Sequence, residues 1–251
     1  MTTKYTCALD GVSLASLDDR ICILDIREDT PLLRLDRFLL PRGGQQIRPV
    51  RESLTVRVTF AIQEEQPRLR RAAMQNVQTW AAKGGMLTVS DRPGQRLAVV
   101  CSEFPSMSAE DWTEPLTLTF ITARCPYWED AEATFLTTSG ASVFTVPGTA
   151  GEAPVSVTVT NTGSEPVTRL SLQCGTTWLI FEDIRLPAGG KCYVEAGDGL
   201  LSAVISGESI LAKRTAGSDD LLLAPCGETS RVQATALQPM EALWKARGRY
   251  A

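Results

Sequence analysis

The segment "FITARCPYWED", residues 120–130, gathers the side chains with the most chemical potential in this sequence. Cys125 is a possible thiolate nucleophile, with Arg124 beside it and two acids, Glu129 and Asp130, after it. Three interpretations are open at this point. The segment could be the active site of a cysteine-dependent hydrolase, a patch that binds a metal or ligand, or the end of a strand where the chain turns.

Histidine is absent from the sequence, and this weighs against the first two interpretations. Histidine is the commonest general base, the commonest metal ligand and the usual partner of a cysteine nucleophile. Adjacent acids occur at Glu64–Glu65 and Asp219–Asp220. Neighbouring side chains on a strand point to opposite faces, so we interpret these pairs as solvated surface. With no G-x-S-x-G or glycine-rich phosphate loop either, we predict that the protein is not an enzyme and has no cofactor.

The cysteines indicate reduced thiols and no metal site. The sequence has 7 of them, an odd number, and no two are spaced as C-x-x-C. A scattered, odd set is typical of free thiols in a reducing compartment, whereas a structural zinc site needs clustered ligands.

Length, charge and hydropathy exclude several other classes. The 251 residues suit two domains, and 43% hydrophobic residues can fill real cores. A net charge of −4 argues against nucleic-acid specificity. No apolar run reaches the ~20 residues of a membrane span, so we expect no membrane insertion. The first residues turn acidic before a signal-like apolar stretch forms.

Periodicity predicts the elements of the N-terminal half. Residues 54–62 alternate apolar and polar side chains, which is typical of a half-buried strand. Residues 67–83 place Leu69, Val77 and Trp80 at helical spacing, between a proline suited to a first turn and a Gly-Gly stop. Residues 86–101 read as a hairpin, and 115–123 as another strand.

The strand at 115–123 leads into Cys125 and the residues that follow it. Pro126 lacks an N–H and biases Cys125 towards an extended conformation. We therefore interpret Cys125, Pro126, Tyr127 and Trp128 as a structural strand-exit motif, with the two aromatics covering a core or facing a neighbour.

The second half reads as a separate β domain. Residues 134–152 are small, polar and rich in glycine, which indicates a boundary, and we place the domains at 1–140 and 141–251. Beyond the boundary, short alternating strands and glycine turns predict a sandwich or jelly-roll of about eight strands. Residues 241–251 could be a final strand or a helical turn. Trp178 is the only tryptophan that we place inside the core region of this sandwich.

The order of these parts resembles the distal tail protein family of long non-contractile-tailed phages and prophages. The resemblance rests on "LPRGGQQIRPVRESLTVRVTFAI", a helix ending in "WAAKGG", the exit "ARCPYWED", "IRLPAGGKCYVEAG" and "LLLAPCGET". The family commonly has aspartate where this chain has Cys125, and Pro-Gly where it has "PCG". The resemblance implies a mainly β fold: a hub domain like a β-sandwich or split barrel with one helix and a hairpin, then a galectin-like β-sandwich.

The resemblance also implies a structural role and a set of partners. Family members form a homo-hexameric ring in the virion tail, assembled in the bacterial cytoplasm, that joins the tail tube protein to the tail tip or tail-associated lysin protein. Candidate ring contacts are the Arg-rich loop 42–51, the strand 54–62 and the 86–101 hairpin. The candidate interface arginines are Arg42, Arg48, Arg51, Arg57, Arg68, Arg70 and Arg71.

Two other functions stay open. A galectin-like sandwich suggests a carbohydrate-binding module, although galectin-type recognition relies on histidine and asparagine beside a stacking tryptophan. A cysteine-dependent hydrolase is the second of these alternatives. For the arginines, a solvated loop and helix start is the alternative to an interface.

Overall fold

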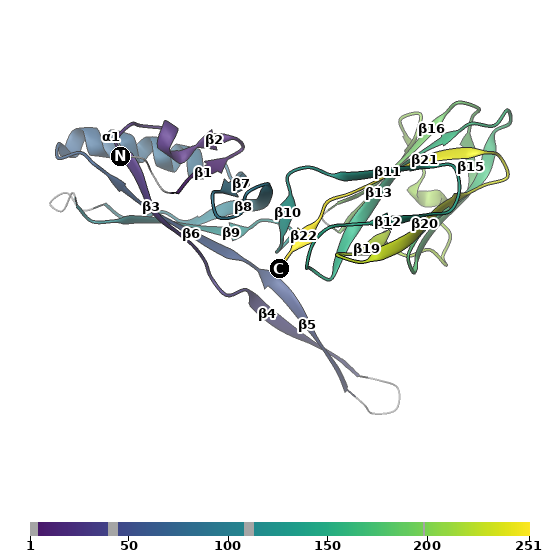
Figure 1. The fold of residues 1–251 in the computed structure, drawn as a ribbon, viewed down its shortest axis with the longest axis horizontal. Helices are drawn as coiled ribbons and strands as arrows, with labels where there is room; N and C mark the ends of the chain where they lie inside the picture. Colours follow the sequence, from purple (N-terminus) through teal and green to yellow (C-terminus); the bar gives the residue numbers. More distant parts are fainter. Residues whose placement is uncertain (1–4, 40–44, 108–112, 198) are drawn as a thin grey trace. The chain divides into compact units, whose positions relative to one another are not determined.

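A computed structural model describes residues 5–39, 45–107, 113–197 and 199–251 (Figure 1). The chain divides into two compact units, Met1–Trp128 and Glu129–Ala251. The division falls directly after Trp128, so the sequence-based boundary at 140/141 lies inside the second unit. Both units are mainly β, as predicted, and the described residues contain one α-helix.

The first unit is built on a sheet with the strand order β2-β1-β7-β8-β9-β6-β3. A second, two-stranded sheet contains only β4 and β5. The elements are β1 (Cys7–Leu9), β2 (Val12–Ser13), η1 (Leu14–Ser16), β3 (Ile21–Glu28), β4 (Leu32–Leu39), β5 (Gln45–Ser53), β6 (Thr55–Ile62), α1 (Pro67–Ala81), β7 (Gly85–Val89), β8 (Gln95–Glu103) and β9 (Leu116–Thr122).

Strand β6 confirms the alternation read from the sequence. Every second residue from Leu54 to Ile62 is at most 2% exposed, while Arg57 between them points to solvent. A period of two puts one set of side chains on the core face, so this pattern needs no tertiary information to interpret. The strand lies between β3 and β9, in the middle of the sheet.

Helix α1 packs on the sheet through the predicted tryptophan. Pro67 is in its first turn, and Gly84, at φ +62°, and Gly85, at φ +139°, follow its end. Trp80 is 6% exposed and meets Phe120 of β9 edge to face, with ring centroids 6.1 Å apart. The prediction was wrong for Leu69, which is 40% exposed, because the buried stripe of the helix begins with Arg70 and not with Leu69.

The second unit is a β-sandwich. One sheet runs β11-β21-β13-β16-β17-β18, with β19 paired to β13, and the other runs β12-β20-β14-β15. Its strands are β11 (Thr134–Thr138), β12 (Ser142–Thr145), β13 (Glu152–Asn161), β14 (Val167–Cys174), β15 (Thr177–Leu186), β16 (Lys191–Gly197), β17 (Leu200–Ile205), β18 (Glu208–Ser209), β19 (Leu223–Pro225), β20 (Thr229–Thr235) and β21 (Met240–Ala246), and η2 (Leu211–Lys213) follows β18. Two short strands, β10 (Trp128–Asp130) and β22 (Arg249–Tyr250), pair with each other and belong to neither sheet of the sandwich.

Two interpretations of this region change. Residues 134–152 are not a simple linker, because β11 and β12 lie within them, one in each sheet. Residues 241–251 form strands rather than a helical turn. The core tryptophan is Trp244, at 0% exposure with its Nε1 donating to Thr138 Oγ1 at 3.1 Å, whereas Trp178 is 41% exposed. Within the described residues, no helix is both long and apolar enough to cross a membrane.

Candidate subunit interface

The β4–β5 hairpin carries the two most exposed large apolar side chains among the described residues of the first unit. Its strands pair only with each other, so both outer edges are open within the described residues (Figure 1). Leu33 and Leu35 on β4 share one face and are 63% and 56% exposed. Their register partners on β5 are Arg51 and Pro49. Exposed leucines on an isolated hairpin indicate a surface that another chain covers.

The hairpin replaces part of an expected loop. The sequence suggested an Arg-rich loop at 42–51, but β5 begins at Gln45. Leu33-Arg34-Leu35-Asp36 alternates as a strand should, and this signal could have revealed β4. On the face opposite the leucines, Arg34 Nε lies 2.7 Å from Asp36 Oδ1.

The other two regions that we expected to form ring contacts have no open strand edge. β6, β7 and β8 each have a hydrogen-bonded neighbour on both sides. A strand paired on both sides has no free N–H and C=O row to offer a second chain. Pairing through 54–62 or the 86–101 hairpin is therefore excluded, and the β4–β5 hairpin is the remaining candidate of the three regions.

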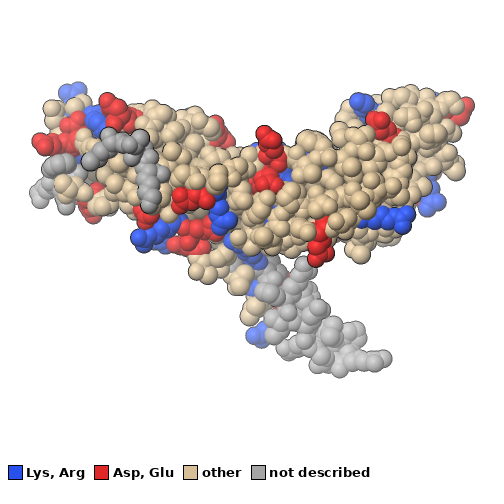
Figure 2. All heavy atoms as spheres, in the orientation of Figure 1, with Lys and Arg blue, Asp and Glu red and all other residues tan. Residues whose placement is uncertain are grey.

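The candidate arginines on the hairpin and β6 differ in their surroundings. Arg42 lies outside the described residues, and Arg48 is the register partner of Asp36 in β5. Arg57 is on the exposed side of β6, where its Nε is 3.0 Å from Asp29 Oδ2. Figure 2 shows acidic and basic side chains mixed where the hairpin joins the unit.

The arginines of α1 divide between surface and interior. Arg68 and Arg71 are exposed on the first turns. Arg70 is 2% exposed and lies inside its own unit, on the same helix side as Ala73 and Val77. Any contact with another chain through α1 would therefore use Arg68 and Arg71. That contact remains a prediction.

Arg51 connects the hairpin to the strand-exit motif. Its guanidinium carbon lies 5.1 Å from the centre of the Tyr127 ring, which is cation–π geometry. The base of β5 is thus held against the residues that follow β9. Tyr127 supports the hairpin in this way, a role that the sequence left undecided.

Trp128 anchors the same motif in the core. It is 1% exposed, its Nε1 donates to Glu28 Oε2 at 2.9 Å, and the Arg92 guanidinium carbon lies 5.7 Å from its ring centre. A cavity of about 460 Å³ opens beside it, and Cys125 is not among the residues that line this cavity. Cys125 is 9% exposed, so the motif is built as a packed strand exit.

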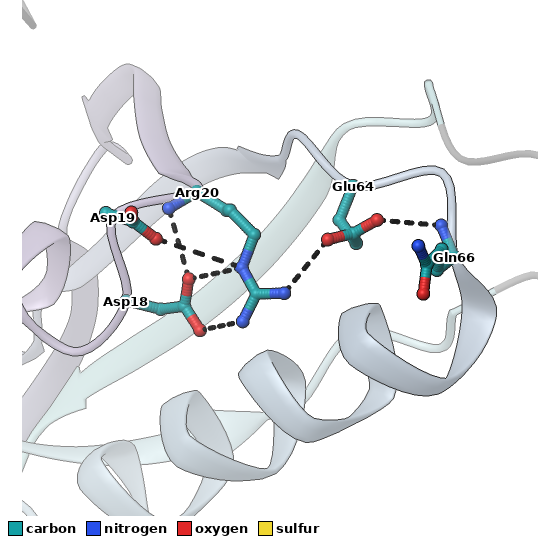
Figure 3. A network of polar contacts seen from close by, with 5 residues as sticks. All are labelled: Asp18, Asp19, Arg20, Glu64 and Gln66. Carbon is teal, nitrogen blue, oxygen red and sulfur yellow. Dashed lines mark hydrogen bonds and ion pairs between the residues drawn. The ribbon is translucent and has the colours of Figure 1, made fainter.

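Glu64, the first acid of the Glu64–Glu65 pair, has a structural role (Figure 3). Arg20, before β3, donates through Nη2 to Asp18 at 2.6 Å and through Nη1 to Glu64 at 3.0 Å. Glu64 in turn accepts the backbone N–H of Gln66, the residue that precedes α1, at 2.9 Å. The network ties the start of β3 to the start of the helix. The Arg20 bonds lower the pKa of Asp18 to about 2, and the Gln66 N–H and Arg20 lower that of Glu64.

We expect Arg20→Gln to remove a pH-dependent part of the stability. Carboxyls with lowered folded-state pKa values stabilise the fold fully above about pH 5, where they are ionised in the unfolded chain too. This contribution is lost as the pH falls towards the folded pKa of Asp18. Urea unfolding from pH 7 to pH 2 should therefore show two curves that differ most at pH 7 and converge in acid. A gap that stays constant across this range would contradict the network.

Burial makes five of the seven thiols poorer nucleophiles. Burial raises the pKa values of Cys7, Cys174 and Cys192 to about 12 and also raises those of Cys101 and Cys226. Among the described residues, no group of three or more His, Cys, Asp or Glu side chains could hold a metal ion.

We expect alkylation of the native protein to follow burial. The partly exposed Cys22 should react with iodoacetamide before Cys7, Cys174 and Cys192, which should react only after unfolding, as mass spectrometry of the peptides would show. Cys125→Ser should leave assembly intact. Rapid alkylation of Cys125 alone near about pH 6 would instead indicate an activated thiolate.

Comparison with known proteins gives a likeness in structure. No protein-family model matches the sequence, and no curated protein matches it. The fold matches SPP1 Dit (gp 19.1), described as a paradigm of hub adsorption apparatus in Gram-positive infecting phages, with a TM-score of 0.71 and 13% identity over 97% of this chain and 98% of that one. A chain of the phage P2 baseplate in its activated conformation with Ca gives a TM-score of 0.45 and 8% identity over 99% and 98%. The first match shows that both units share the fold of a Dit protein.

Proposed function

We propose that this chain is a structural protein of a phage or prophage tail, which forms a hub ring between the tail tube and the tail tip or receptor-binding apparatus. The observation that carries the proposal is the likeness in fold to SPP1 Dit over 97% of this chain and 98% of the other. A likeness that spans both units supports a shared architecture for the whole protein rather than one common domain.

The first unit supplies the ring contact in this proposal. Six copies close into a homo-hexameric ring, because identical subunits joined head to tail form a ring when the rotation closes. Such an interface needs two different surfaces on each subunit. The β4–β5 hairpin, with exposed Leu33 and Leu35, provides one of them.

The proposed partners and location follow from that role. The ring contacts the tail tube protein on one side and the tail tip or tail-associated lysin protein on the other. The protein is made in the bacterial cytoplasm and ends in the virion tail. The role is mechanical and involves no catalysis, nucleic-acid specificity or membrane insertion.

Negative-stain microscopy and mass photometry of the purified full chain test the proposal. The expected result is six-membered rings, with monomers appearing on dilution when no tube protein is present. A chain that stays monomeric at concentrations of about 100 μM, where interfaces of roughly −6 kcal/mol would form, argues against a hub.

A further inference from the structure

The second unit carries an exposed tryptophan in polar surroundings. Trp178 on β15 is 41% exposed, whereas the other tryptophans in the described part of the chain are at most 6% exposed. A covered tryptophan side chain buries a large apolar area. A tryptophan left exposed on a folded domain therefore indicates a binding surface for a ligand or another chain.

Both backbone polar groups of Trp178 form hydrogen bonds with Asp219. Its N–H donates to Asp219 Oδ2 at 2.6 Å, and its carbonyl accepts the N–H of Asp219 at 2.8 Å. One step along the edge, the N–H of Ile180 donates to Ser218 Oγ at 2.9 Å. The edge of β15 is thus closed by the segment 215–219, so a strand from another chain cannot pair with it here. What remains available is the outer face, with the indole on a rigid support.

Two glutamines continue a row from Trp178 across that face. Gln173 on β14 is the register partner of Trp178, and Gln233 on β20 is the register partner of Gln173. The row faces outward, because Leu172 and Cys174 on either side of Gln173 are fully buried. Strands lie ~4.8 Å apart, so the row from β15 to β20 is roughly 10 Å long.

Hydrogen bonds orient both amides. Gln173 Nε2 donates to the carbonyl of Gly175 at 3.1 Å, and Gln233 Oε1 accepts from Arg231 Nη2 at 3.2 Å. These partners fix which end of each amide is oxygen. The Oε1 of Gln173 and the Nε2 of Gln233 have no partner among the described residues, so the face offers an acceptor and a donor beside an aromatic ring.

We propose that this face of the β12-β20-β14-β15 sheet binds a neutral oligosaccharide. A pyranose ring has an apolar C–H face, which fits the indole of Trp178, and hydroxyl groups at its edge, which fit the amides of Gln173 and Gln233. The row is long enough for more than one sugar ring. A protein interface would instead place apolar side chains around the tryptophan, whereas its cross-strand neighbour here is an amide. The residue set also differs from the histidine-containing galectin type.

The test uses the full-length chain on an array of immobilised neutral hexose and N-acetylhexosamine oligosaccharides, followed by calorimetric titration with the best-bound sugar in solution. We expect saturable binding that weakens at least ten-fold in Trp178→Ala and less in Trp178→Phe, with Gln173→Ala and Gln233→Ala weakening it too. Tyr193→Ala is the matched control, because Tyr193 is 46% exposed on β16 in the other sheet.

The inference is independent of the ring, which is measured on the same samples by mass photometry. Unchanged rings with lost sugar binding in Trp178→Ala support it. Protein retained by none of the sugars, or equal affinity in the wild type and Trp178→Ala, overturns it. Loss of ring formation in Trp178→Ala overturns it as well, because the face would then be a protein contact.

Discussion

The double variant Leu33→Glu, Leu35→Glu is expected to convert rings of the full chain into monomers. The two leucines are 63% and 56% exposed on the hairpin, so glutamate at these positions costs little in the folded subunit. In the proposed ring they lie against a neighbour, and burying one leucine contributes about 1.5–3 kcal/mol. Losing both removes roughly 3–6 kcal/mol from every interface, which raises the dissociation constant by a factor of at least about 100.

Mass photometry over a dilution series measures this effect. Leu237→Glu is the control, because Leu237 is 94% exposed in the second unit and belongs to no proposed contact. The control should form rings like those of the wild type. Rings that persist in the double variant at the wild-type dissociation constant would remove the hairpin from the interface, while rings in neither protein would remove the hub proposal itself.

Trp80→Ala is expected to lower the free energy of unfolding of the first unit by about 3–5 kcal/mol, as a truncation in a packed core. The indole is 6% exposed, packs edge to face on Phe120, and donates from Nε1 to the carbonyl of Val12 at 3.0 Å. Alanine leaves a cavity between α1 and the sheet and also leaves this carbonyl without its partner.

Hydrogen exchange of core amides in β6 and β9 reports on this unit alone. Trp178→Ala is the matched variant, since the same substitution on the surface of the other unit should change stability by at most about 0.5 kcal/mol. A cost below about 1 kcal/mol for Trp80→Ala would mean that the helix does not depend on the indole for its packing.

The amino-acid sequence by itself determined the local elements. The alternation in 54–62 and the helical spacing after Pro67 produced β6 and α1, because each pattern has a period that only one regular structure shares. The absence of histidine and the scattered spacing of the cysteines can also be read directly from the sequence. Likewise, Pro126 was enough to predict that the strand now seen as β9 ends before this residue.

Only the tertiary structure decided which surfaces are open. The sequence pattern of β6 says that one face is buried, but not that β3 and β9 occupy both its edges. The burial of Arg70 and the cation–π contact between Arg51 and Tyr127 likewise depend on elements distant in sequence.

The two tryptophans of the sandwich show most clearly why the sequence alone could not tell which side chains are exposed. Trp178 lies in "TWLIF", an apolar run without alternation, and Trp244 lies in "EALWKA", which alternates weakly. Successive side chains on a strand point to opposite faces, and pairing with neighbouring strands decides which face is inside. That pairing put Trp244 in the core and left Trp178 on the surface beside Gln173. The same long-range pairing left the β4–β5 hairpin, with its two leucines, outside the main sheet.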